Sequence, residues 1–384
     1  MFRKIYTILL VSASFLVLHG QDHEELKKKL SLLFIGDIMG HEEQIWSAEN
    51  RETHTYSYDT VFSFIREEIS EADIAVANFE VTLAGAPYSG YPAFSSPAEL
   101  AVACRNAGID VMVTANNHAA DKGKRGIIST INKLDSLGIP HTGTFLDQAQ
   151  RDSLFPMLIS KNGIKLAMLN YTYGTNGITV PPPVIVNTLD RNLIAGDIRK
   201  AKSMNPDAII VFVHWGTEYD TIPSSSQTSL AGYLFEHGAD IIIGSHPHVI
   251  QKMIWTKCDT CGRDRIVVYS LGNFVSNQRR PKTDGGTMVR IELEKDDSSL
   301  VVTDAGYYLT WVYTPIENYR KRFFILPCSK FEDKTEFFTN QADYLKMKSF
   351  IKGARDLLYN QNMRINELIF SGNRWLYSFL PPSP

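Results

Sequence analysis

Short apolar runs, each followed by a polar cluster, recur along this 384-residue chain and constrain its fold more than any other feature. The runs have strand length and begin at Leu32, Ile74, Val111, Ala167, Ile209, Ile241 and Ile266. Turn residues bound them, as is typical of strands buried on both faces of a sheet. Stretches with helical signals lie between them, at residues 58–72, 98–107, 125–137 and 225–236. Strands that alternate with helices predict an α/β fold.

The chain changes character after the last of these runs. Residues 286–293 and 300–309 read as a hairpin added to the sheets, and residues 340–371 carry apolar residues at helical spacing. The sequence shows no internal repeat and no clear linker. We therefore expect one domain over residues 31–312, followed by a C-terminal helical extension over residues 313–384.

The first twenty residues have the pattern of a secretory signal peptide. Arg3 and Lys4 precede a short apolar stretch from Tyr6 to Leu18, and a small residue follows. This stretch is shorter than the ~20 residues that a membrane-spanning helix needs. We expect residues 1–20 to be cleaved and the mature protein to be exported to the periplasm or cell envelope. The alternative is an uncleaved segment, which would then be the membrane contact.

The net charge and the cysteines limit which partners and which cellular compartment are expected. The formal net charge is -3 and 21% of residues are charged, so no large basic surface for nucleic acid is expected. Cys258 and Cys261 form a CxxC in a turn, which favours a local disulfide in an exported protein. Cys104 and Cys328 are expected to be buried free thiols.

The polar residues at the ends of the apolar runs are candidate metal ligands. They are Asp37, His41, Asn78, Glu80, Asn116, Asn117, His118, His214, Glu218, His246, His248 and Asn273. Ligands of open α/β sheets bind beyond the carboxyl ends of the strands. Imidazole, carboxylate and amide groups without a thiolate suit Mn, Fe, Zn or Mg. Two such ions that share a carboxylate can activate water and stabilise a phosphoryl displacement.

The pair His246-Pro247-His248 is the most informative part of this set. A period of two directs both imidazoles to one side, and Pro247 stiffens the link between them. Single members have structural alternatives: Asp37 as a turn cap, Asn78 as a helix cap, and His214 as a core histidine bonded to backbone. Convergence from separate strands favours the metal site.

Six ordered motifs together resemble one family. They are Gly36-Asp37, Asn78-Phe79-Glu80, Asn116-Asn117-His118, His214-Trp215-Gly216-Thr217-Glu218, Gly244-Ser245-His246-Pro247-His248 and Leu271-Gly272-Asn273-Phe274. They are similar to those of the CapA capsule-synthesis family, which is associated with poly-γ-glutamate capsule biosynthesis. That family resembles the calcineurin-like metallophosphoesterases in fold. The resemblance implies a metallophosphatase-like four-layer sandwich, with two packed β-sheets flanked by helices.

The resemblance also implies roles for individual residues. Asp37 and His248 would hold one ion, and Asn117, His214 and His246 the other. Glu80 would bridge the two ions, and His118 would be the general acid. Around them, Asn78, Asn116, Glu218 and Asn273 would contact the substrate or support the ligands.

Two departures from the phosphoesterase pattern concern the first motif. Phosphoesterases normally carry Asp-x-His there, but Met39 stands at the histidine position. The loss of that ligand would leave one ion weakly held or absent. Many family members also have an Arg shortly after this motif, where this chain has His41-Glu42.

Two loops are expected to shape the pocket. Residues 171–183 follow a strand directly and contain three prolines, so they should overhang the site. Residues 278–286 carry Arg279, Arg280 and Lys282, cations that could grip phosphate or poly-glutamate carboxylates. The alternative for this second loop is a solvated surface turn.

These observations leave three functions open. The first is an envelope protein of capsule or poly-γ-glutamate assembly with a metal-dependent hydrolase-like core. The second is a metallophosphoesterase acting on an exported phosphoester, and the third is a non-catalytic scaffold that binds polymer. The expected partners are an anionic polymer or a phosphoester substrate, together with envelope-assembly proteins. Met39 disfavours the second function, and the Asn117-His118 pair disfavours the third.

Overall fold

The computed structural model describes residues 27–297 and 299–378. The predicted signal peptide, residues 1–20, lies outside the described residues. Within the described ranges, no helix combines the length and the apolar character needed to cross a membrane.

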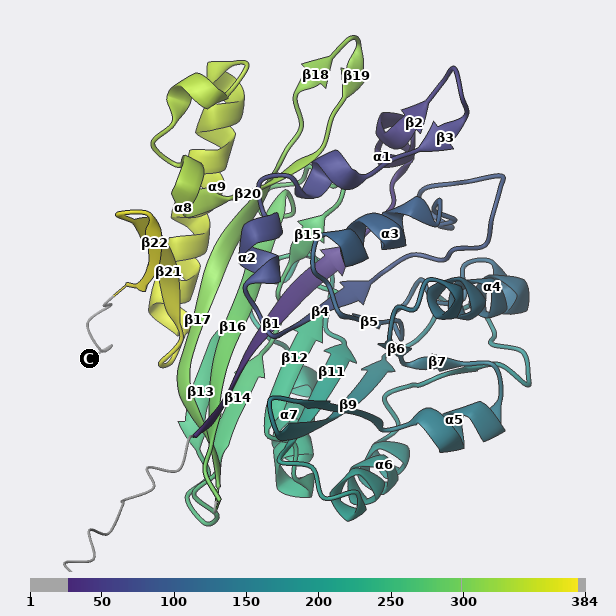
Figure 1. Ribbon diagram of the computed structural model, residues 1–384, viewed down its shortest axis with the longest axis vertical. Coiled ribbons are helices and arrows are strands. Elements are labelled where there is room, and N and C mark those ends of the chain that lie inside the picture. The colour runs from purple at the N-terminus through teal and green to yellow at the C-terminus, as the bar shows by residue number, and fades with distance from the viewer. Residues whose placement is uncertain (1–26, 298, 379–384) are drawn as a thin grey trace, which may run out of the picture.

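The first sheet is mixed. Its strands, in spatial order, are β22 (Arg374–Tyr377), β21 (Asn366–Ser371), β17 (Leu300–Tyr313), β16 (Gly285–Lys295), β1 (Lys28–Ile38), β4 (Ile74–Phe79), β5 (Val111–Val113) and β6 (His141–Thr142). In addition, β15 (Asn273–Val275) pairs with β1, and β20 (Phe324–Pro327) pairs with β17. Strands β1, β4, β5 and β6 run parallel, so their carboxyl ends meet at one edge (Figure 1).

The second sheet also combines parallel and antiparallel strands. Its strands, in spatial order, are β13 (Met253–Lys257), β14 (Asp264–Val268), β12 (Ile241–Ser245), β11 (Ala208–His214), β9 (Ile164–Thr172) and β8 (Met157–Lys161). The four inner strands are parallel, and the two edge strands are antiparallel to them. All seven apolar runs identified in the sequence therefore lie in strands, as predicted.

Side chains alternate along these strands and build a layered core. In β1, Leu32 and Phe34 face the second sheet, whereas Leu33 and Ile35 face the outer helices. The Phe34 ring meets that of Phe212 from β11 at 5.7 Å, which joins the two sheets. Two packed sheets with helices on their outer faces confirm the predicted four-layer sandwich (Figure 1).

Five helices cover the outer faces of the two sheets. Helices α2 (Arg66–Ser70), α3 (Glu99–Asn106) and α4 (Gly123–Ser136) pack on the first sheet, and α6 (Arg191–Ser203) and α7 (Ser225–His237) on the second. The remaining short elements are α1 (Glu42–Ala48), β2 (Glu49–Asn50), β3 (Thr55–Tyr56), η1 (Asp59–Phe62), β7 (Thr144–Phe145), α5 (Gln148–Leu154), β10 (Ile185–Val186), β18 (Ile316–Glu317), β19 (Arg320–Lys321), α8 (Cys328–Phe331) and η2 (Thr335–Phe337). The helix predicted over residues 58–72 is divided into η1 and α2.

The segment after residue 312 contains the long helix α9 (Gln341–Gln361), which packs against the core between the sheets. This helix is shorter than the predicted 340–371, because the Asn362 side chain binds the backbone of Met253 and Ile365 and stops it. The sequence did not predict the strands β18 to β22 in this segment. The division into domains at residue 312 stays a prediction.

The cysteines are placed as expected. Cys258 and Cys261 form a disulfide in the turn between β13 and β14. Cys104 and Cys328 are buried and unpaired.

Candidate metal centre

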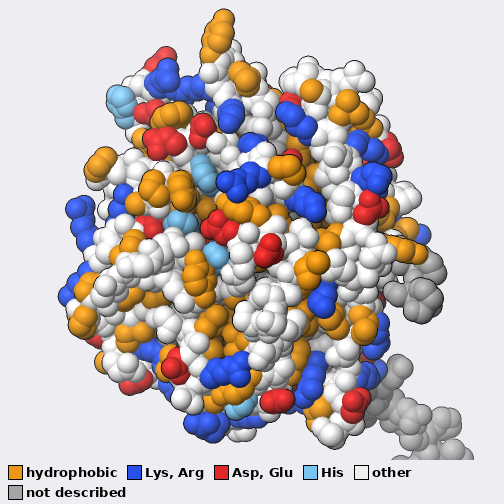
Figure 2. All heavy atoms as spheres, turned by 180° about the vertical axis from the view of Figure 1, so that it is seen from behind, with side chains coloured by type: hydrophobic (Ala, Val, Ile, Leu, Met, Phe, Trp, Pro, Cys, Tyr) orange, Lys and Arg blue, Asp and Glu red, His pale blue; other side chains and the backbone are white. Residues whose placement is uncertain are grey.

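The carboxyl ends of both sheets converge on one cluster of polar side chains. Asp37 is the next-to-last residue of β1, Asn78 and Glu80 lie at the end of β4, and His214 is the last residue of β11. The loops after β5 and β12 add Asn117, His118, His246 and His248, and Asn273 opens β15. Histidine and acidic side chains are visible near the middle of one face, with lysines and arginines beside them (Figure 2). The structure thus brings together side chains from six separate segments.

The Asn78 amide joins two buried carboxylates. Its Nδ2 donates to Asp37 Oδ1 at 2.8 Å and to Glu80 Oε2 at 3.1 Å. Asp37 and Glu80 are both fully buried. Two carboxylates this close in a buried site are stable only with a shared donor or a cation between them.

His214 and Asn117 form a second contact in the cluster. The Nε2 of His214 lies 2.8 Å from Asn117 Oδ1, and its Nδ1 lies 2.9 Å from Ser245 Oγ. The Asn117 Nδ2 donates to Asn176 Oδ1 at 3.2 Å, which leaves Oδ1 facing the histidine. One imidazole nitrogen and one amide oxygen are therefore presented together, as the predicted second ion would need.

His248 is oriented by two oxygen acceptors. Its Nδ1 lies 3.0 Å from Asp37 Oδ2 and 3.1 Å from Asn273 Oδ1. The Asn273 amide nitrogen donates elsewhere, to Gln278 Oε1 and the Thr283 carbonyl. The His248 proton consequently sits on Nδ1, and the lone pair of Nε2 faces the cluster. A carboxylate behind a histidine in this way is the usual support of a metal ligand.

His246 is held in a strained backbone. Its φ is +98°, and that of His248 is +57°, in the region that favours glycine. Such strain persists where surrounding contacts impose it, most often at functional sites. The preceding Gly244 permits the turn, since a Cβ there would come within 2.1 Å of the Tyr269 carbonyl oxygen. His246, His248 and Glu218 have ligand atoms within 4.8 Å of one another.

Several buried polar atoms of this cluster lack a partner among the described residues. They are Glu80 Oε1, Asn78 Oδ1 and His246 Nδ1. Glu80 Oε1 lies 3.6 Å from His214 Nε2 and 3.8 Å from His248 Nε2. Asp37, Glu80 and His214 also have ligand atoms within 4.8 Å of one another. A carboxylate oxygen that faces two imidazoles and has no donor of its own fits a bridging metal ligand.

The electrostatics favour uncharged imidazoles in this cluster. Burial lowers the pKa of His246 to about 4, with a further contribution from His248. Burial likewise holds the pKa of His214 well below its usual value. In the opposite direction, burial and the neighbouring Asp37 raise the pKa of the Glu80 carboxyl. Neutral imidazoles beside unsatisfied carboxylates are a site that a cation would stabilise.

His118 has a partner that the sequence analysis did not identify. Its Nδ1 lies 2.8 Å from Asp121 Oδ2, which also accepts the Phe94 N–H at 2.7 Å. The His118 backbone N–H donates to Asn116 Oδ1, whose Nδ2 binds the Phe79 carbonyl. Asp121 therefore fixes the ring and keeps the proton at Nδ1, which leaves Nε2 for exchange. The sequence did contain a signal for this partner, because Asp121 stands three residues after the candidate acid His118.

The two departures in the first motif have structural counterparts. Met39 is buried in the apolar cluster beneath the outer helices, so it adds packing and no ligand. His41 accepts the Asn277 N–H at Nδ1, and its ring packs against Phe94. Burial lowers the pKa of His41 to about 4. The Phe94 ring contacts both the His41 ring and the His118 ring.

Aromatic side chains from two loops border the cluster. Tyr173, from the predicted overhanging loop, is partly exposed and lies 4.6 Å from the His246 ring. Tyr219 lies 6.4 Å from the His248 ring, and the Arg280 guanidinium stacks on it at 4.5 Å. Arg279 donates to the Ser276 carbonyl and lies near Phe323. Arg280 is therefore connected to the cluster, whereas Arg279 is directed toward Phe323.

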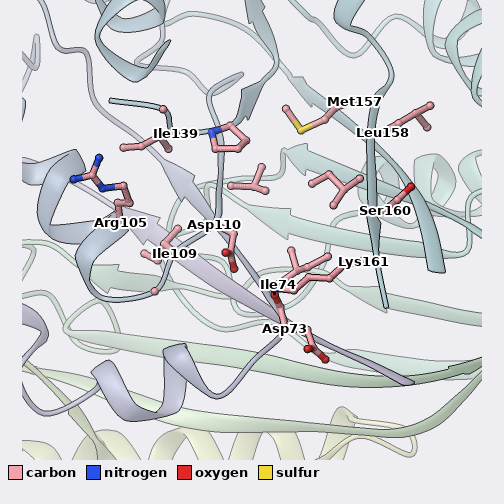
Figure 3. A pocket seen from close by; sticks show the side chains of 15 residues that line it. Asp73, Ile74, Arg105, Ile109, Asp110, Ile139, Met157, Leu158, Ser160 and Lys161 are labelled. Atoms are coloured by element: carbon pink, nitrogen blue, oxygen red, sulfur yellow. The ribbon is translucent and has the colours of Figure 1, made fainter. Parts of the chain in front are cut away.

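A separate pocket of about 600 Å³ lies at the opposite, amino ends of the strands (Figure 3). Its two carboxylates already accept backbone N–H groups: Asp73 from Ser31, and Asp110 from Ala75. The pocket consequently offers no free convergent ligand set among the described residues. The chemistry of this chain is concentrated at the carboxyl ends.

Comparison with known proteins places the chain among capsule proteins. It is 29% identical over 292 residues to "Capsule biosynthesis protein CapA" of Bacillus anthracis, covering 73% of this chain and 67% of that one. It is 28% identical over 279 residues to "PGA biosynthesis protein CapA" of Bacillus subtilis (strain 168), covering 70% of this chain and 68% of the other.

Among solved structures, similarity is found to the calcineurin-like phosphoesterase YfkN from Bacillus subtilis, at 16% identity and a TM-score of 0.41, over 74% of this chain and 90% of that one. The 5'-nucleotidase from Candida albicans SC5314 matches at 10% identity and a TM-score of 0.39, over 85% of this chain and 58% of that one. Residues 31–278 match the family described as "Bacterial capsule synthesis protein PGA_cap", so the chain belongs to the PGA_cap family of bacterial capsule synthesis proteins.

Proposed function

We propose that this protein is a metal-dependent hydrolase of capsule assembly, acting in the cell envelope on poly-γ-glutamate or on a carrier of that polymer. The observation that carries the proposal is the partnerless Glu80 Oε1 between His214 and His248. A buried carboxylate oxygen without a donor is costly unless a cation binds it. Export of the chain through a cleaved signal peptide is part of the same proposal.

The ligands divide into two overlapping sets. Asp37 and His248 would hold one divalent ion, Asn117, His214 and His246 would hold the other, and Glu80 would be shared by both. Glu218 joins His246 and His248 closely enough to serve as an additional ligand. Because the donors are nitrogen and oxygen, Mn, Fe or Zn fits the set. Such an ion would polarise the scissile group and lower the pKa of water.

The surrounding residues supply the proton and the orientation. His118 would deliver a proton to the leaving atom from Nε2, and Asp121 would hold its ring in place. Asn78 joins the Asp37 and Glu80 carboxylates by donating to both. Asn273 orients His248 through Nδ1. Each role needs only contacts that the folded chain already makes.

A second candidate is a phosphoesterase acting on an exported phosphoester, favoured by the His118–Asp121 pair, which suits protonation of an alkoxide. A screen with added Mn would separate the candidates, using γ-glutamyl polymers, phosphodiesters and phosphomonoesters as substrates. Cleavage of the γ-glutamyl polymer supports the first function, and cleavage of phosphoesters alone supports the second. No turnover of any class, with polymer bound, would indicate a scaffold.

A further inference from the structure

A pocket of about 840 Å³ opens between the 278–286 loop and α9, on the side of the metal centre where Arg280 stacks on Tyr219. We propose that this pocket binds successive carboxylates of a γ-linked glutamate chain while one linkage lies at the metal centre. The inference rests on the proposed function and names a subsite for its substrate. The cations that line the pocket are Arg279, Arg280, Lys282, Lys321 and Lys346. We call this pocket, with all of its lining residues, the cationic pocket.

Carboxylates balance only part of the positive charge in the cationic pocket, where Lys346 pairs with Asp343 and Lys321 lies 3.8 Å from Glu43. Asp284 accepts the Trp311 indole N–H at 2.8 Å, and Asp343 pairs with Lys346 at 3.1 Å. Arg280 and Lys282 have no carboxylate within ion-pairing distance among the described residues. The pocket is therefore locally positive in a chain whose net charge is -3. Unpaired cations in a concave site favour an anionic ligand.

The loop that carries these cations is held in one conformation. The buried Thr283 closes it, with its N–H and its hydroxyl both donating to the Arg280 carbonyl, at 3.1 and 3.0 Å. The Thr283 carbonyl in turn accepts the Asn273 amide at 2.8 Å. Because the loop is ordered before binding, less conformational entropy is lost when a ligand arrives.

The same contacts join the pocket to the metal centre. Asn273 binds both the loop and His248 Nδ1. On the other side, the Tyr219 N–H donates to the Pro247 carbonyl at 2.8 Å, between the two metal-site histidines. Arg280 stacks on Tyr219. A polymer that leaves the metal centre past Tyr219 would therefore meet Arg280 first and Lys282 after it.

Helix α9 forms the far wall. Gly285 permits its approach, because a Cβ at this position would lie 2.6 Å from the Phe350 ring. Lys346 lies one turn earlier on α9 and lines the same pocket. The volume of the pocket exceeds that of a single glutamate unit, so several carboxylates can be held at once. Each exposed contact is weak, but linked contacts add through effective concentration.

The test compares binding of a γ-glutamyl dimer and a long γ-glutamyl oligomer to the metal-replete protein. For the wild type we expect the oligomer to bind more tightly, and more so at low salt. Arg280→Ala/Lys282→Ala should weaken oligomer binding on the order of ten-fold and leave the dimer nearly unaffected. Arg125→Ala/Lys133→Ala, which removes the same charges from exposed α4, is the matched control and should behave as wild type.

The outcomes separate the two proposals. Equal oligomer affinity in wild type and Arg280→Ala/Lys282→Ala, with turnover intact, would overturn the subsite alone. No binding or turnover of any γ-glutamyl ligand would overturn the proposed function and the subsite together. Polyphosphate binding that depends on Arg280 and Lys282, without glutamyl binding, would assign the pocket to another anion and reject the carboxylate class.

Discussion

The metal centre and the cationic pocket lie side by side but are built in opposite ways. The centre consists of buried side chains that hold one another, such as Asp37, Asn78 and His248. In the pocket, Arg280 and Lys282 project from a loop and have no carboxylate partner among the described residues. Buried groups fix geometry, because each unpaired atom is costly, whereas exposed cations mainly add attraction and tolerate replacement. We therefore expect the reaction chemistry in the first region and the recognition of substrate length in the second.

The largest expected effect breaks the centre itself. His246→Ala/His248→Ala removes one imidazole from each of the two proposed ligand sets, so we expect bound Mn, Fe or Zn to fall to background. Elemental analysis of metal-replete protein would measure this loss, with circular dichroism to verify folding. His54→Ala, at an exposed histidine, is the control and should keep the wild-type stoichiometry. Unchanged metal content in the double variant would refute the ligand assignment.

The next effect separates proton transfer from metal binding. His118→Ala should lower turnover by roughly 10²–10⁴-fold and leave the bound metal unchanged. Asp121→Asn acts through the His118 ring, so the combined variant should lose no more activity than His118→Ala alone. Initial rates of the four proteins would measure this coupling. Additive losses would show that Asp121 acts independently of His118.

A smaller effect concerns the protonation of the Glu80 carboxyl. The pKa of the Glu80 carboxyl is raised in the folded protein. Between the unfolded and the folded pKa, the folded carboxyl keeps a proton that the unfolded one has lost. The free energy of unfolding therefore falls as the pH rises through this range. Glu80→Gln should therefore stabilise the metal-free protein at neutral pH, by roughly 1–2 kcal/mol. The gain should shrink on acidification, and metal should stabilise the variant less than wild type. Thermal melts with and without Mn would check both signs, and a destabilised metal-free variant would contradict them.

An effect of comparable size on stability, with no effect on metal or ligand, is expected outside both regions. Cys258→Ser/Cys261→Ser removes a disulfide that closes a very short loop, so the free energy of unfolding should fall by about 2 kcal/mol at most. Metal content and oligomer affinity should not change. Denaturant melts would measure the first quantity, and loss of metal would show that the hairpin supports the centre.

The convergence of several candidate ligands could be predicted from the sequence. The ends of parallel strands in one sheet meet at one edge, so Asp37 and Asn78 had to lie near each other once the strands were recognised. His214 ends a strand of the other sheet, and it joins them only because the two sheets pack together. Asp121 was missed because its part depends on a loop turning back toward His118. The grouping of Glu218 with His246 and His248 was missed for the same reason, since no strand places it.

The sequence by itself determined the alternation of strands and helices, the ligand types and the family motifs, because these depend on local spacing and side-chain chemistry. Only the tertiary structure decided which buried atoms lack hydrogen-bond partners and which ring nitrogen of His248 carries the proton. It alone also decided that α9 and the 278–286 loop form a pocket. Those features depend on contacts between residues far apart in the chain, and no local pattern encodes them. The strand β20 illustrates this limit, because it forms by pairing with the strand β17.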